Sequence, residues 1–392
     1  MKFSKRMDHL RGSDIRAILK MTEEPGMISF AGGMPAPELF PIEEIKEASA
    51  QVLTDHGKQS LQYTITEGFL PLREQIAQRM LAKFSASYSP QDILITSGSQ
   101  QGIELSGKLF LDDEDVVLCE SPSFLGAFQA FRVYNPRFIE VPTDDQGMIM
   151  EELTRILETT DRVKLIYVIP DFQNPTGRSW SLARRKALME IAGSYDIVVV
   201  EDNPYGELKY EGEMLPSLAS FDRKGQVVFL GSFSKILCPG FRIGWVCASP
   251  QWMEKYVIAK QAADTHTSTF CQRIVHTYME RFDLDENIGK IKDVYRNRRD
   301  LMLEIMEREF PEEASFKKPL GGLFIWVELP ATVNTREILK KSLEKGVAFV
   351  PGGSFYPNGG HENALRLNFS NMLEEKIREG IPRLAAVMRE FL

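Results

Sequence analysis

Residues 231–245 read Gly-Ser-Phe-Ser-Lys-Ile-Leu-Cys-Pro-Gly-Phe-Arg-Ile-Gly-Trp, and the prediction of the fold starts from this stretch. The apolar runs Val227–Leu230 before it and Ile243–Cys247 at its end are short and β-branched or aromatic, which predicts two buried strands. Lys235 therefore lies in a tight Gly- and Pro-containing connection at the end of a strand. A lysine in this place is either a solvated loop charge or an amine positioned for chemistry, and the rest of the chain has to decide between them.

The composition is that of a globular protein large enough for two domains. The chain has 392 residues, of which 43% are hydrophobic and 26% charged, with a net charge of −8. The acidic balance argues against a protein that coats nucleic acid or binds membrane surfaces. Four scattered cysteines without a CxxC spacing predict neither a disulfide framework nor a metal site. The charged N-terminus lacks an apolar signal-peptide core and no apolar run is long enough to span a bilayer, so we expect a cytoplasmic protein.

Apolar runs and amphipathic stretches alternate through the middle of the chain. The predicted strands are residues 92–96, 116–119, 138–141, 164–169 and 197–200, and the predicted helices between them are about 103–110, 125–134, 151–158 and 182–195. This order predicts an α/β fold with a mostly parallel sheet that is covered by helices on both faces. Sheets of this kind bind ligands at the carboxyl ends of their strands.

The pattern changes on either side of this region. Further helices are predicted at residues 13–21, 42–54, 70–84, 252–262, 270–281 and 285–309, a loop at 311–319, and further strands at 323–329, 348–350 and 365–369. The C-terminal strands, separated and followed by helices, predict a smaller α+β domain. We therefore expect an N-terminal segment (1–40) that packs near the small domain and the active site, a large domain (41–285) and a small C-terminal domain (286–392).

Polar side chains follow consecutive predicted strands of the large domain. Asn174 follows one strand, Asp202 and Tyr205 follow the next, and Lys235 follows the third. Taken singly, each is explained by a turn or an interface. Together they place an amine, a carboxylate, an amide and a phenol at one edge of the sheet, while the turn 97–102 leads into a helix N-terminus that favours an anion. Pyridoxal phosphate requires such a set, with an amine for its aldehyde, a carboxylate for its pyridine nitrogen, donors for its phenolic oxygen and an anion site for its phosphate.

Over nearly its whole length the chain resembles the fold-type I pyridoxal-phosphate-dependent aminotransferases. Within that family it is similar to the branch that contains 2-aminoadipate, kynurenine and broad-specificity aromatic aminotransferases. The motifs that carry the resemblance, in chain order, are Ser-Phe-Ala-Gly-Gly-Met-Pro, Gly-Ser-Gln-Gln-Gly, Gln-Asn-Pro-Thr-Gly, Glu-Asp-Asn-Pro-Tyr, Gly-Ser-Phe-Ser-Lys and Leu-Arg-Leu-Asn-Phe. The resemblance implies a large cofactor-binding domain with a mostly parallel sheet, and a smaller α+β domain formed by the C-terminus with the N-terminal segment.

The resemblance also implies roles around the cofactor ring. Lys235 would bond covalently to the cofactor and would later act as the base that moves the proton from the substrate Cα. Asp202 would pair with the pyridinium nitrogen, and Tyr205 and Asn174 would hydrogen-bond the phenolic oxygen. Phe124 would stack on the ring, at a position where many relatives have a tyrosine and therefore a further phenol hydrogen bond.

By the same resemblance the cofactor phosphate would be held by a group of small polar residues and one arginine. These residues are Ser99, Gln100, Ser232, Ser234 and Arg242. Tyr63 would reach the phosphate of the neighbouring subunit, which implies a homodimer with shared active sites.

Arg366 would bind the substrate α-carboxylate as a bidentate fork. The alternative is a surface arginine in a salt bridge, but the flanking Leu365 and Leu367 indicate a buried strand, where an unpaired arginine would be costly. Gly33 would bring backbone close to the substrate.

The predicted helix at residues 13–21 matches a segment that covers the substrate side chain in 2-aminoadipate-type relatives. Ser13 and Arg16 are the candidate substrate contacts there. Arg16 either pairs with a distal carboxylate of an acidic substrate or is an exposed helix charge, and the sequence leaves both open.

The implied activity is transfer of the α-amino group of an amino acid to a 2-oxo acid, with 2-oxoglutarate as the expected acceptor, by a ping-pong mechanism. One alternative keeps the cofactor but catalyses C–S bond cleavage or decarboxylation on the same fold. Another is the non-catalytic cofactor-binding domain of a transcription regulator. Such regulators carry an N-terminal winged helix-turn-helix, for which motifs that start near residue 30 leave no room, and the net charge does not suit a DNA-binding arm.

Overall fold

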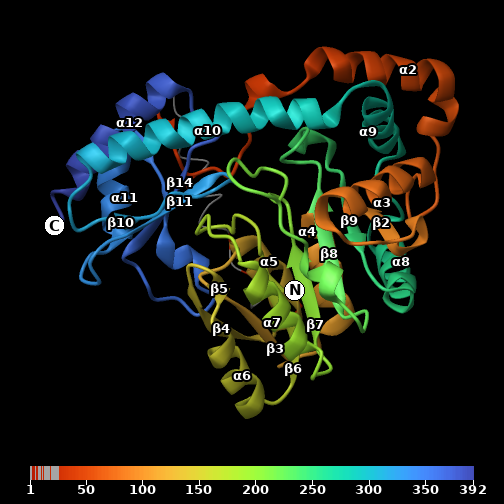
Figure 1. Ribbon diagram of the computed structural model, residues 1–392, viewed down its shortest axis with the longest axis horizontal. Coiled ribbons are helices and arrows are strands. Elements are labelled where there is room, and N and C mark those ends of the chain that lie inside the picture. The colour runs from red at the N-terminus through yellow and green to blue at the C-terminus, as the bar shows by residue number, and fades with distance from the viewer. Residues whose placement is uncertain (1, 5, 8–9, 11, 13–17, 19–25) are drawn as a thin grey trace.

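An eight-stranded sheet forms the centre of the larger part of the molecule in this computed structural model, which describes residues 2–4, 6–7, 10, 12, 18 and 26–392 (Figure 1). The strand order is β2-β9-β8-β7-β6-β3-β4-β5. The bounds are β2 (Ile93–Thr96), β3 (Val116–Ser121), β4 (Arg137–Asp144), β5 (Gly147–Met148), β6 (Val163–Val168), β7 (Val198–Asp202), β8 (Val227–Ser232) and β9 (Gly244–Cys247). All pairs from β8 to β4 are parallel, whereas β9 and β5 run antiparallel to their neighbours, so the predicted mostly parallel sheet is confirmed.

Helices lie around this sheet and one long helix leads away from it. The helices of this part are α2 (Ile42–Ser60), α3 (Leu70–Phe84), α4 (Ser99–Phe110), α5 (Leu125–Phe131), α6 (Met150–Thr159), α7 (Leu182–Ala192), α8 (Pro250–Asp264) and α9 (Thr269–Arg281). Helix α10 (Leu284–Glu309) begins where the Asp283 carboxylate accepts hydrogen bonds from the backbone N–H groups of Asp285 and Glu286. It crosses the top of Figure 1 and packs along α12 (Glu374–Met388), so it connects the two parts of the molecule.

A smaller antiparallel sheet forms the second part, in the order β10-β11-β14-β13. Its elements are β10 (Ser315–Phe316), β11 (Phe324–Glu328), β13 (Val350–Pro351) and β14 (Ala364–Asn368), with α11 (Thr335–Glu344) between β11 and β13. A separate parallel pair joins β1 (Ile28–Ser29) to β12 (Val347–Ala348). The N-terminal segment is therefore tied to the C-terminal part of the chain, while the domain boundaries at residues 40 and 285 stay predictions.

Several element bounds differ from the predicted ones because pairing partners are not visible in a local pattern. The predicted loop 311–319 contains β10, whose two residues pair with the far end of β11. The predicted strand 348–350 is divided between β12 and β13, which belong to different sheets. The helix predicted from residue 103 already begins at Ser99, after Gly98 with its positive φ of 78°. The predicted helix 13–21 lies outside the described residues, apart from Ile18.

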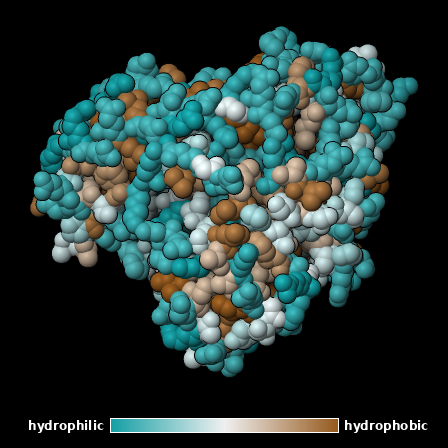
Figure 2. Space-filling model, viewed as in Figure 1, coloured by the Kyte–Doolittle hydropathy of each residue, from teal (hydrophilic) through white to brown (hydrophobic). Residues whose placement is uncertain are grey.

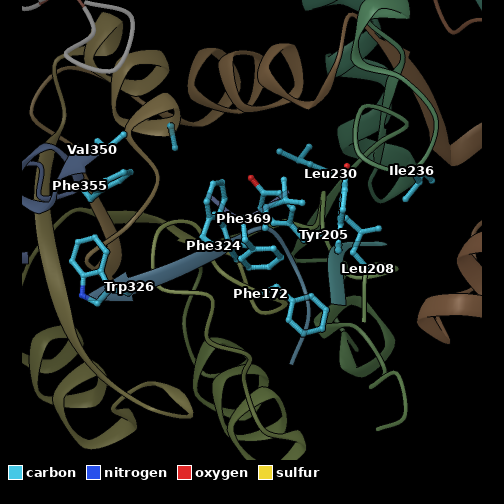
Figure 3. Packing of buried hydrophobic residues seen from close by; sticks show 14 of the residues in the cluster. Phe172, Tyr205, Leu208, Leu230, Ile236, Phe324, Trp326, Val350, Phe355 and Phe369 are labelled. Atoms are coloured by element: carbon cyan, nitrogen blue, oxygen red, sulfur yellow. The ribbon is translucent and has the colours of Figure 1, made fainter. Parts of the chain in front are cut away.

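One hydrophobic core joins the two sheets beneath the polar strand ends. The ring of Phe324 on β11 lies edge-on to the ring of Tyr205, with 5.9 Å between the ring centres. Figure 3 shows this contact together with buried residues from both parts of the molecule. These are Phe172, Leu208, Leu230, Trp326, Phe355 and Phe369. Close packing of this kind holds the small sheet in a defined position relative to Tyr205.

Hydrophilic residues cover most of the face shown in Figure 2, and hydrophobic residues form small separate groups on it. None of the helices in the described ranges combines the length and the apolar character needed to cross a membrane.

Candidate active site

A cavity of about 260 Å³ lies at the carboxyl ends of β6, β7 and β8. Its lining includes most of the residues that the sequence predicts for the site, namely Gly33, Ser99, Gln100, Phe124, Asn174, Asp202, Tyr205, Ser232, Ser234, Lys235, Arg242 and Arg366. Tyr63 is not among the lining residues, because its side chain is on the surface with its ring edge against His266. Ser13 and Arg16 lie outside the described residues.

Lys235 follows the end of β8 and turns its amine toward the N-terminal segment. Its Nζ donates a hydrogen bond to the carbonyl oxygen of Gly33 at 2.6 Å. Burial, and then the positive charges of Arg366 and Arg242, lower the pKa of Lys235 to about 8. The neutral, nucleophilic form of this amine is therefore far more accessible near neutral pH than that of an ordinary lysine.

Asp202 ends β7 and has one free carboxylate oxygen. The hydroxyl of Tyr167 donates to Oδ2 at 2.7 Å, while Oδ1 is buried and has no hydrogen-bond partner in the described structure. Burial raises the pKa of Asp202 to about 7, and the hydrogen bond from Tyr167 opposes that rise. A buried acceptor without a partner is costly, so Oδ1 marks a place where a ligand can donate.

Tyr167 is a residue of the site that the sequence did not reveal. It lies within the apolar run of β6, where the local pattern indicates only a buried strand residue. The parallel register pairs Tyr167 with Val200, and side-chain alternation puts Val200 and Asp202 on the same face of the sheet. The phenol reaches the carboxylate because of that register, which the sequence pattern does not specify.

Arg366 lies on β14 and reaches from the small sheet to the large one. Its Nη1 donates to Oδ1 of Asn174 at 2.7 Å and its Nη2 to the carbonyl oxygen of Ala31 at 2.5 Å. The guanidinium group lies 4.2 Å from the ring centre of Phe324 and 5.0 Å from that of Phe355. Burial lowers the pKa of Arg366 to about 10, so the side chain stays charged at neutral pH. Its Nε has no partner in the described structure, which leaves a buried donor available to a ligand.

A cradle for an anion lies between β2 and α4. The N–H groups of Ser99 and Gln100 are in the first turn of α4, at the positive end of the helix dipole. Arg242 approaches the turn and donates to the carbonyl oxygen of Ser97 at 3.2 Å and to Oγ of Ser234 at 3.4 Å. A Cβ at Gly98 would lie 2.2 Å from Nη2 of Arg242, so the close approach of the arginine requires glycine there.

The turn 202–206 is held from behind by a buried ion pair that the sequence also did not reveal. Both terminal nitrogens of Arg185 donate to the carboxylate of Asp171, at 3.2 and 2.5 Å. Asn203 donates to the same carboxylate at 2.9 Å and accepts from the backbone N–H of Gly206 at 3.0 Å. The turn that carries the site residues is therefore fixed by charge-assisted hydrogen bonds.

The cavity fits pyridoxal phosphate. Lys235 offers an amine of lowered pKa, and the unpartnered Oδ1 of Asp202 offers an acceptor for a cationic ring N–H. The cradle with Arg242 suits a phosphate, and Phe124 provides an aromatic face in the same lining. The described donors and acceptors thus match the aldehyde, the ring nitrogen and the phosphate of the cofactor.

Comparisons with known proteins agree with this geometry. The family model for aminotransferase class I and II matches residues 26–384. Aromatic-amino-acid aminotransferase 1 of Thermococcus litoralis is 45% identical, over 99% of this chain and 94% of that protein. The solved structure of Pyrococcus horikoshii kynurenine aminotransferase in complex with PMP has a TM-score of 0.95 and 43% identity, and the alignment covers 100% of this chain and 97% of that one.

A further solved structure shows a related cofactor adduct. LysN, the alpha-aminoadipate aminotransferase of Thermus thermophilus, complexed with N-(5'-phosphopyridoxyl)-L-leucine, has a TM-score of 0.92 and 41% identity, with 99% of this chain and 97% of that one covered. Three observations therefore agree: the sequence similarity over nearly the whole chain, the shared fold and the cavity that suits the cofactor. The chain belongs to the class I and II aminotransferase family and is a pyridoxal-phosphate-dependent aminotransferase.

Proposed function

We propose that this enzyme transfers the α-amino group of aromatic and acidic amino acids to 2-oxoglutarate by a ping-pong mechanism. The observation that carries the proposal is that the amine of Lys235 and the buried guanidinium of Arg366 line one cavity. An α-amino acid presents its carboxylate to Arg366 and its amine and Cα to Lys235, and a 2-oxo acid fits in the same way. Relatives that act on aromatic amino acids, kynurenine and alpha-aminoadipate support this range of donors.

In this proposal each lining residue has a defined task. When bound, pyridoxal phosphate supplies an aldehyde for amine exchange and a ring that accepts the electrons released at Cα. Lys235 takes the proton from Cα, a step for which a pKa of about 8 is well matched to neutral pH. Oδ1 of Asp202 accepts from the ring nitrogen, Tyr205 and Asn174 hydrogen-bond the phenolic oxygen, and Phe124 stacks on the ring. The phosphate is held by Ser99, Gln100, Ser232, Ser234 and Arg242.

The donor range can be tested through Arg16. Among the described lining residues the cations are Lys235, Arg242 and Arg366, and the proposal gives each of them another task. We therefore expect Arg16→Ala to lower kcat/KM for 2-aminoadipate and glutamate about tenfold, the effect of one lost charged hydrogen bond, and to leave phenylalanine and kynurenine unchanged. For each donor of the panel except glutamate, the measurement is the formation of glutamate from 2-oxoglutarate. When glutamate is the donor, 2-oxoadipate is the acceptor and the formation of 2-aminoadipate is measured.

Two outcomes of this panel would contradict the proposal. Unchanged ratios between acidic and aromatic donors would make Arg16 an exposed charge with no part in recognition. Release of a keto acid and ammonia in the absence of any 2-oxo acid would favour the C–S lyase alternative.

We also propose a homodimer in which each active site uses Tyr63 of the partner subunit. Tyr63 is 82% exposed, and its neighbours Leu61 and Ile65 are 75% and 55% exposed, so they form an apolar segment that a second copy can cover. Tyr63→Ala and Lys235→Ala should each inactivate the enzyme, by weakening phosphate binding and by removing the amine.

Subunit mixing tests this arrangement. Random mixing of the two variants should restore about a quarter of wild-type activity, because half of the dimers are hybrids with one intact site. If Tyr63 acts in its own subunit, mixing restores nothing. A monomer in sedimentation experiments would rule out the shared site.

Removal of the Tyr167 hydroxyl should change how cofactor binding depends on pH. The pKa of Asp202 is about 7 with this hydrogen bond in place, so the carboxylate loses its charge as the pH falls through that value. In Tyr167→Phe the carboxylate loses a charged hydrogen bond and its pKa rises further, by roughly one to two units. The affinity of the cofactor-free protein for pyridoxal phosphate, measured on both sides of pH 7, should therefore fall off at correspondingly higher pH.

Tyr256→Phe provides the matched control, because it removes another buried phenol, one that is 2.7 Å from Oγ of Ser106 and away from Asp202. Its pH midpoint should equal that of the wild type. An unshifted midpoint in Tyr167→Phe would show that Tyr167 does not influence the charge of Asp202.

A further inference from the structure

A buried lysine lies behind the anion cradle, outside the cavity lining. Lys260 on α8 has no exposed side-chain surface and donates to both oxygens of Asp264, at 2.8 and 3.0 Å. It also donates to Oε1 of Gln101 at 2.8 Å, and Nε2 of Gln101 donates to Oδ2 of Asp264 at 2.8 Å. We call Lys260, Asp264 and Gln101 the Lys260 cluster. Its hydrogen bonds form a closed triangle between α8 and the first turn of α4.

The triangle allows one orientation of the Gln101 amide. A lysine ammonium can only donate and an ionised carboxylate can only accept, so Oε1 must face Lys260 and Nε2 must face Asp264. Burial alone would raise the pKa of Asp264, but the hydrogen bonds from Lys260, Gln101 and Ser97 outweigh it and hold the pKa below its usual value. The carboxylate is therefore ionised at neutral pH and keeps its role as an acceptor.

Gln101 connects the cluster to the cradle through the backbone of one residue, Ser97. Its Oε1 accepts from the backbone N–H of Ser97 at 2.8 Å, and Oγ of Ser97 donates to Asp264 at 3.2 Å. The carbonyl oxygen of the same residue accepts from Arg242 at 3.2 Å. Ser97 is thus held by the Lys260 cluster on its N–H side and holds Arg242 on its carbonyl side, immediately before Gly98 and the first N–H groups of α4.

We propose that the Lys260 cluster positions the cradle for the cofactor phosphate, by fixing the backbone of Ser97 and with it Arg242 and the N-terminal turn of α4. A flipped Gln101 amide would present N–H to the N–H of Ser97, and the turn would have to move. Lys260 is a positioning residue in this arrangement, since it acts through Gln101 and does not line the cavity. The inference rests on the phosphate site given under Proposed function.

The test compares pyridoxal phosphate with pyridoxal, which has no phosphate, on the cofactor-free protein. Lys260→Met and Gln101→Leu should each weaken the binding of pyridoxal phosphate about tenfold, the effect of one misplaced charged hydrogen bond, and should leave pyridoxal binding within about twofold of wild type. Because Lys260 acts through Gln101, the double variant should lose no more than either single variant. Absorbance titration gives both affinities without any assay of turnover.

Tyr256→Phe is the matched control, since it removes the contact between α8 and Ser106 on α4 and leaves the cluster intact. It should leave the preference for pyridoxal phosphate over pyridoxal unchanged. The proposal is wrong if Lys260→Met and Gln101→Leu weaken the binding of pyridoxal phosphate and of pyridoxal equally. It is also wrong if Tyr256→Phe shows the same selective loss of pyridoxal phosphate binding. In either case the cluster only connects the two helices. Thermal unfolding of each variant identifies any that does not fold, and the less buried Gln101→Leu then decides.

Arg242→Ala separates a failure of this inference from a failure of the phosphate site itself. Its loss of preference for pyridoxal phosphate should be at least as large as that of Lys260→Met. If Arg242→Ala keeps the full preference, the phosphate is bound elsewhere and the proposed site is wrong.

Discussion

Replacement of Lys235 by alanine should lower amino transfer at least ~10⁴-fold, the upper range of what one positioned proton-transfer group supplies. The variant should also lose the absorbance of covalently attached pyridoxal phosphate, since no other described amine lines the cavity. The Nζ of Lys235 lies in the cavity, 2.6 Å from the carbonyl oxygen of Gly33, and its pKa is lowered to about 8, which suits the two proposed functions of covalent attachment and proton transfer. Stopped assays of glutamate formation and absorbance spectra of the purified variant provide the measurements.

Two further experiments distinguish the amine chemistry of Lys235 from the effect of its positive charge. Lys235→Arg keeps a cation in the cavity but has no amine that can be deprotonated near neutral pH, so it should be as inactive as Lys235→Ala. A small primary amine added to Lys235→Ala should restore part of the turnover by taking the Cα proton in place of the lysine. Wild-type rates in Lys235→Arg would mean that the residue contributes only its charge.

Replacement of Arg366 by leucine should lower kcat/KM for amino acids by about 10² to 10⁴, because the substrate carboxylate then enters a buried site without its cation. The guanidinium group is held ready by Asn174, by the carbonyl oxygen of Ala31 and by the face of Phe324. Arg366→Lys should recover only part of the loss, since an ammonium group cannot form the two parallel hydrogen bonds of the fork.

A substrate without a carboxylate provides the decisive comparison. Phenylethylamine should react slowly and at the same rate with wild type and Arg366→Leu. In the variant, the kcat/KM for phenylalanine should fall toward that for phenylethylamine. If both substrates slow equally in the variant, Arg366 supports the fold or the cofactor and not the carboxylate. The absorbance of bound pyridoxal phosphate checks that each variant still binds its cofactor.

Much of the fold could be predicted because it depends on local patterns. Buried parallel strands are short apolar runs, and their connections begin with polar, Gly- and Pro-rich turns. Asn174, Asp202 and Lys235 each follow such a run, and the sheet does bring them to one cavity at its carboxyl edge. The short strands β1, β5 and β10 could not be predicted in this way, because two residues carry no periodicity and become strands only through their partners.

The sequence by itself determined the types of chemical group, their order along the chain and their placement at strand ends, since these follow from side-chain identity and local periodicity. The tertiary structure alone decided which groups meet. Lys235 meets Gly33 across 202 residues and Arg366 meets Asn174 across 192, while Tyr167 reaches Asp202 through strand register and Lys260 reaches Gln101 through helix packing. Such contacts depend on the relative placement of whole elements, which is set by the summed packing of the shared core and by no single stretch of sequence.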